Sequence, residues 1–92
     1  MIVRILGEGQ LAVDDSMSAE LNELDAQLEA AVNAGDEAAF HPVLEHLLAR
    51  VRAAGTPVPA DSLEASDVIL PYSEASMDDV RALLTDDGLI PG

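Results

Sequence analysis

The residues best spaced for chemistry are the glycines near the N-terminus. Gly7-Glu8-Gly9-Gln10-Leu11-Ala12 has the G-x-G-x-x-A spacing with which dinucleotide-binding proteins hold a pyrophosphate. That chemistry requires a helix that begins inside the motif, so that its free amides face the phosphates. Here the residues after Gly9 are typical of a returning strand, and helix-capping residues come only at Asp14 to Ser16. We therefore interpret the two glycines as hairpin positions that need a positive φ, with no cofactor.

The other side chains do not form the patterns typical of a metal site or of a catalytic nucleophile. His41 and His46 are five residues apart, which places them about 140° from each other on a helix, so they cannot share a metal ion. His41 with Glu45 is better spaced, but two ligands are not a complete set. The sequence has no Cys, no Lys and no G-x-S-x-G motif. We therefore predict no metal site, no catalytic residues and no enzymatic activity.

Three acidic pairs remain, and none has the D-x-D-x-D-G spacing of a calcium loop. Asp14-Asp15 and Asp78-Asp79 lie at the starts of predicted helices, where negative charge is stabilising. Asp86-Asp87 follows a predicted helix, where the helix dipole disfavours negative charge. Because no structural role accounts for Asp86 and Asp87, we predict that they contact a partner.

The net charge limits the classes of partner. Eighteen acidic residues against four arginines give a net charge of −14 in 92 residues, enough for a single domain spanning 1–92. Nucleic acid and anionic lipid are disfavoured because both require a basic surface. The acidity either keeps a small protein soluble or steers a basic partner towards it. With no signal peptide, no apolar span and no cysteine, the sequence predicts a cytoplasmic protein without direct membrane insertion.

The elements follow from periodicity and from turn residues. Residues 2–6 and 10–13 predict a β-hairpin around Gly7-Glu8-Gly9. Two helices follow, separated by Asn33-Ala34-Gly35, and this short connection predicts an antiparallel pair. Each helix has an apolar stripe. The stripes are Met17, Leu21, Leu24, Leu28, Ala31 and Val32 in the first helix and Phe40, Val43, Leu44, Leu47, Leu48 and Val51 in the second.

Pro42 interrupts the second helical pattern, and we expect either a kink or a separate short turn over 36–41. After a connector at 55–60, residues 67–70 predict a short strand at the edge of the hairpin sheet. Ser76 and Asp79 form a capping box for a third helix from about Met77 to Asp86. Gly88 would end this helix, with residues 89–92 packed down as an apolar tail. The predicted fold class is α+β.

Opposite its core stripe, the first helix carries a row of mostly small side chains. Small side chains either let a second helix approach closely or simply reflect the high helix propensity of alanine. On the first interpretation the row contacts a partner. Its residues are Ala19, Glu23, Ala26, Ala30 and Asn33.

Three segments together carry a resemblance to a known family. They are residues 1–10 (MIVRILGEGQ), 21–25 (LNELD) and 83–92 (LLTDDGLIPG). They resemble the PspA-associated proteins, PspAA, of actinobacteria and some archaea, and the likeness runs from end to end. In that family the protein is encoded beside PspA, the coiled-coil, ESCRT-III-like effector of the phage-shock envelope-stress response. Pro42 departs from the family, whose second helix is uninterrupted.

The resemblance implies a non-enzymatic adaptor or regulator that binds PspA and reaches the membrane peripherally, through PspA. A small nucleic-acid-binding regulator and a homo-oligomeric structural module are the alternatives. Because a chain of this length has a thin core, we also expect a homodimer, formed through an exposed sheet edge or the alanine row.

Overall fold

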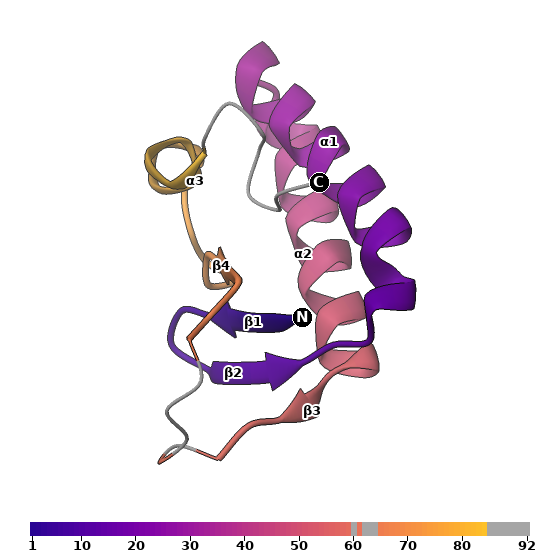
Figure 1. Ribbon diagram of the computed structural model, residues 1–92. Helices are drawn as coiled ribbons and strands as arrows, with labels where there is room; N and C mark the ends of the chain where they lie inside the picture. Colours follow the sequence, from indigo (N-terminus) through magenta and orange to yellow (C-terminus); the bar gives the residue numbers. More distant parts are fainter. Residues whose placement is uncertain (60, 62–64, 85–92) are drawn as a thin grey trace.

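A computed structural model describes residues 1–59, 61 and 65–84 of the chain. The fold is α+β, as predicted: a small sheet with two long helices against one face and a short third helix (Figure 1). The strands are β1 (Ile2–Ile5), β2 (Gly9–Ala12), β3 (Thr56–Pro57) and β4 (Val68–Leu70). The helices are the 3-10 turn η1 (Asp15–Met17), α1 (Ser18–Ala34), α2 (Glu37–Ala54) and α3 (Met77–Leu83).

The described strands form one sheet in the order β3-β2-β1-β4. β1 and β2 are the predicted hairpin, and Gly7 and Gly9 have the expected positive φ, 85° and 104°. β4 is the predicted edge strand, and it pairs parallel to β1. β3 was not predicted, because Pro57 argues against a strand; it pairs with β2 over two residues at the opposite edge, where proline is tolerated.

The core lies between the sheet and the helix pair. Val3 and Ile5 of β1 point towards the helices and are almost fully buried. Both predicted helical stripes are also buried, except for Met17 and Val43, which are partly covered. Phe40 is the aromatic residue of this core, while Tyr72 is exposed. Aliphatic side chains therefore supply most of the hydrophobic stabilisation.

Local capping fixes the helix ends, with one correction. The first helix was predicted from Met17 with a cap among Asp14, Asp15 and Ser16, but Asp14 caps the turn η1, and α1 begins at Ser18. Gly35, at φ 68°, ends α1. The side chain of Asp36 then accepts a hydrogen bond from the amide of Ala39 at 3.2 Å and so caps α2.

The capping box of α3 is present as predicted. The Asp79 amide donates to Ser76 Oγ, and the Ser76 amide donates to Asp79 Oδ2, both at 3.1 Å. The predicted helix end at about Asp86 is wrong, because α3 ends at Leu83 and Leu84 already has an extended backbone, with φ −68° and ψ 137°. The predicted stop at Gly88 and the tail 89–92 lie outside the described residues.

Pro42 lies inside α2, which runs unbroken from Glu37 to Ala54, so the separate turn expected over 36–41 is wrong. Proline removes the amide that would bond to the carbonyl of Ala38. Both Pro42 and Ala38 are exposed, so water can reach that carbonyl. A single unbroken helix is thus compatible with the proline.

Ion pairs and one side-chain-to-backbone bond tie the elements together at the surface. Arg52 near the end of α2 binds Glu8 in the hairpin turn through two hydrogen bonds, one of 2.8 Å from Nε. Arg50 binds Glu20 of α1 at 3.0 Å, across the antiparallel helix pair. Arg81 of α3 donates to the carbonyl oxygen of Val32 at 3.0 Å, near the C-terminal end of α1.

The pairing with Arg52 lowers the pKa of Glu8 below its ordinary value of 4.5. We expect Glu8→Gln to reduce the free energy of unfolding by about 0.5 kcal/mol at pH 7, because both side chains are more than one-third exposed. Since the folded-state pKa is the lower one, this contribution is present above pH 4.5 and is lost as the pH falls through the folded-state value. Urea denaturation across this range measures it. Glu74→Gln, at an exposed position, is the control, and a difference that persists at pH 2 contradicts the assignment.

Candidate interaction surface

The row of small side chains predicted on the first helix is exposed on α1. Leu21, Leu24 and Leu28 face the core, so positions on the opposite side of the helix face solvent. We call the exposed row the alanine face, and its residues are Ala19, Glu23, Ala26, Ala30 and Asn33.

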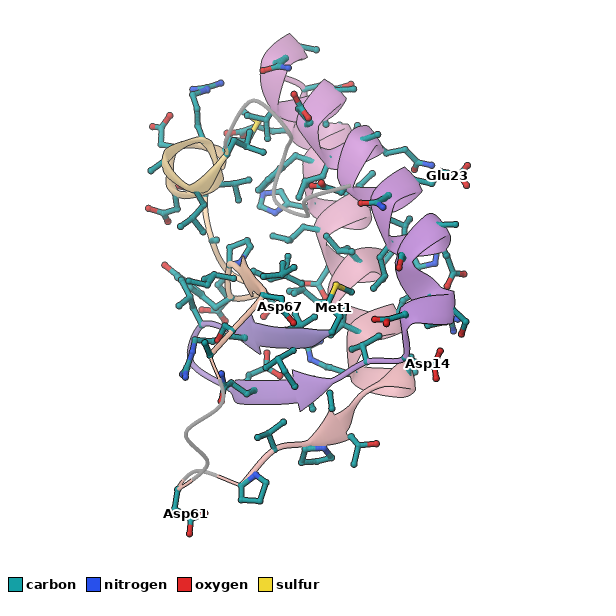
Figure 2. The ribbon with its side chains drawn as sticks, in the orientation of Figure 1. Met1, Asp14, Glu23, Asp61 and Asp67 are labelled. Atoms are coloured by element: carbon teal, nitrogen blue, oxygen red, sulfur yellow. The ribbon has the colours of Figure 1, made fainter. Side chains whose placement is uncertain are left out.

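The alanine face is smooth and carries one charge. Figure 2 shows Glu23 pointing away from the sheet, and Glu23 forms no ion pair with any described residue. Glu20, on the adjoining row, is instead paired with Arg50. Because the other side chains are short, a second helix could approach at the close end of the usual interaxial range, about 8 Å.

Of the acidic pairs, Asp86 and Asp87 lie outside the described residues. Asp79 has the capping role that the sequence predicted, whereas Asp14 caps the turn η1 and not the first α-helix. The hydrogen bond from the Ser16 amide lowers the pKa of Asp14, so this carboxylate stays ionised as a cap. These two groups therefore serve the fold.

Asp25 was missed in the sequence, although it is 3% exposed and is the one buried charged side chain among the described residues. It takes part in a polar interaction. The signal was present: Asp25 is four residues after Leu21 and three before Leu28, which places it within the core stripe of α1.

The glycine turn does not have the geometry of a dinucleotide site. A cavity of about 330 Å³ lies beside it, and its lining includes Arg4, Glu8 and Gly9. Gly9 begins strand β2, however, and the first α-helix starts only at Ser18, so no helix N-terminus faces this cavity. Glu8 would also place a carboxylate beside any phosphate. The prediction of a hairpin turn is therefore confirmed.

The two histidines, His41 and His46, are both exposed on α2. Within residues 1–59, 61 and 65–84, no group of three or more side chains has the arrangement of a metal site. In the same part of the chain, no helix is long and apolar enough to cross a bilayer.

The sequence model of the PspA-associated protein family matches residues 1–92, the entire chain. This chain belongs to the PspA-associated protein family. No curated protein and no solved structure matches it. The family match includes α1, so the alanine face of this PspA-associated protein belongs to the matched region.

The alanine face should be dispensable for folding. We expect Ala26→Gln to change the free energy of unfolding by less than about 0.5 kcal/mol, because the side chain is exposed and both residues favour helices. Leu28→Ala, on the buried side of the same helix, should cost about 2–5 kcal/mol. Urea denaturation of both variants gives the comparison. A cost above 1.5 kcal/mol for Ala26→Gln would show that the face is already packed against the protein itself.

Proposed function

We propose that the protein is a non-enzymatic adaptor or regulator that binds PspA in the phage-shock, envelope-stress response. The observation that carries the proposal is the family match over residues 1–92, because the family is named for association with PspA. The exposed alanine face supplies a surface of suitable shape. On this proposal the protein is cytoplasmic and reaches the membrane peripherally, through PspA.

The alanine face suits a long helix, such as one from a coiled-coil protein. Ala19, Ala26 and Ala30 repeat at spacings of seven and four along α1, so they follow one line on its surface. A partner helix lying along that line could bury its own larger side chains between them. Glu23 would then meet a Lys or Arg of the partner. We include Asp86 and Asp87 as a second acidic contact.

The distribution of the arginines favours a protein partner over nucleic acid. Among the described residues, Arg50, Arg52 and Arg81 each form an ion pair with a carboxylate of the chain itself. Their charge is therefore already neutralised at the surface. Binding to a phosphate backbone requires cations that can replace condensed counterions. We infer that the surface potential, at a net charge of −14, attracts basic side chains.

Titration of PspA from the same genome tests the proposal. We expect Ala26→Arg to weaken binding at least about tenfold, because a long charged side chain would keep the helices apart. The matched control is Ala49→Arg, which makes the same change at an exposed alanine of α2. Glu23→Lys should weaken binding less, and more at low salt than at high salt.

Two outcomes of the titration have different meanings. If the wild-type protein does not bind PspA at tens of micromolar, the proposed function fails. If the wild type binds and Ala49→Arg is as damaging as Ala26→Arg, the function stands but the alanine face is not the contact. Asp86→Asn combined with Asp87→Asn tests the second acidic contact in the same assay.

We also propose that the free protein forms a homodimer through the alanine face. This surface carries a single carboxylate, Glu23, so two highly acidic copies would meet there with little local repulsion. Light scattering should show a mass that rises with concentration, and Ala26→Arg should abolish the rise. A strict monomer at millimolar concentration would refute the homodimer and leave the PspA contact unaffected.

A further inference from the structure

The exposed large apolar side chains of the described residues gather at one edge of the sheet. They are Leu6, 36% exposed, and Ile69 and Tyr72, each 45% exposed. The Leu6 amide donates to the carbonyl oxygen of Leu70 at 3.0 Å, which places Leu6 beside the end of β4, and Tyr72 follows β4 by two residues. We call these three residues the β4 patch. Their clustering is unusual, because scattered single residues are the normal pattern.

Among residues 1–59, 61 and 65–84, none forms a backbone hydrogen bond to the outer side of β4 beside the β4 patch. β4 is an edge strand, hydrogen-bonded to β1 on one side. Since the carbonyl of Leu70 faces β1, strand alternation turns the N–H and C=O of Ile69 to the outer side. Natural proteins usually protect such an edge with a lysine, a proline or a bulge within the strand. β4 has an exposed isoleucine at its centre instead, and the proline, Pro71, comes after the strand.

The charges around the β4 patch indicate the kind of partner. Glu74 follows Tyr72 and is exposed, whereas Asp67, before β4, accepts the Ile2 amide of β1 at 2.8 Å through Oδ2. Arg4, the exposed register partner of Ile69 on β1, is the cation nearest to this edge and donates to Ser66 Oγ. Glu74 forms no ion pair with a described residue. A second copy of the chain would bring the same exposed Glu74 carboxylate to the edge, whereas the alanine face carries Glu23 as its single charge. A segment with apolar residues at its centre and basic residues at its ends fits both the patch and its surroundings.

We propose that the edge of β4 binds an extended segment of a partner protein, which adds a strand to the sheet through the backbone of Ile69. Apolar side chains of that segment cover Leu6, Ile69 and Tyr72, and flanking Lys or Arg residues meet Glu74 and the negative field of the chain. This is strand addition, a mode distinct from helix packing on α1. In Figure 2 Glu23 of the alanine face points away from the sheet that contains β4 (labelled in Figure 1), so one partner need not displace the other.

A synthetic peptide tests the proposal on the full chain. The probe is acetyl-Lys-Val-Thr-Val-Thr-Val-Lys-amide, added up to about 1 mM, in the range of a weak peptide complex. NMR amide shifts should change first at Ile69 and at its neighbours in the β4 patch. A peptide with Glu in place of both Lys residues should bind at least about fivefold more weakly, as should one N-methylated at its central valine, which blocks backbone pairing.

Variants of the chain complete the test. Ile69→Thr keeps a strand-forming residue but removes apolar surface, and Tyr72→Ser removes the ring; each should weaken peptide binding at least about fivefold. Thr56→Ser, at the opposite sheet edge, is the matched control and should bind as the wild type does. Ile69→Thr should leave the affinity for PspA unchanged, which separates this proposal from the one above.

Several outcomes would overturn the proposal. They are shift changes centred on α1, equal binding of the two charge forms of the peptide, or no shift changes at the highest concentration. If light scattering shows a dimer that Ile69→Thr abolishes, the occupant of the edge is a second copy of this chain, and the proposed basic partner is wrong.

Discussion

Burial of the inner face of β1 against the helix pair is the contact on which the other elements depend. β1 lies inside the sheet, paired to β2 on one side and to β4 on the other, so Val3 and Ile5 join strands from three parts of the chain to one core. A core with one aromatic ring must be closed by many aliphatic side chains, each contributing about 1.5–3 kcal/mol when buried. The apolar stripes of α1 and α2 are therefore taken up by the core. The opposite side of α1, which carries the alanine face, is not part of it.

Local signals predicted most of the fold. The stripes of α1 and α2, the left-handed Gly35 and the Ser76–Asp79 box all act within a few residues, and the structure confirms them. The sequence could not predict that β4 pairs parallel to β1, because that register depends on contacts over more than sixty residues. The separate turn expected over 36–41 is absent because the hydrogen bond that Pro42 removes matters little at an exposed position.

The two proposed interaction surfaces differ in how far the sequence predicts their exposure. Exposure of the alanine face follows directly from helical periodicity once the core stripe is known. The β4 patch was hidden, because Val68-Ile69-Leu70 is uniformly apolar, and only the pairing with β1 shows which residue of the three faces outward. Asp25 was overlooked for a related reason: residue type suggested the surface, whereas its spacing placed it in the core.

The arginines connect the fold to the acidity of its surface. Arg52 fixes the hairpin turn to α2, and Arg81 joins α3 to the end of α1, so these cations serve internal contacts. Since each is neutralised within the chain, the excess carboxylates determine the field that an approaching molecule meets. That field falls off within about 8 Å at physiological salt, so it guides encounters but does not hold a complex together. Packing on the alanine face and backbone pairing at β4 would have to slow the dissociation of a complex. Among basic partners, the alanine face would select a helix and the edge of β4 an extended segment.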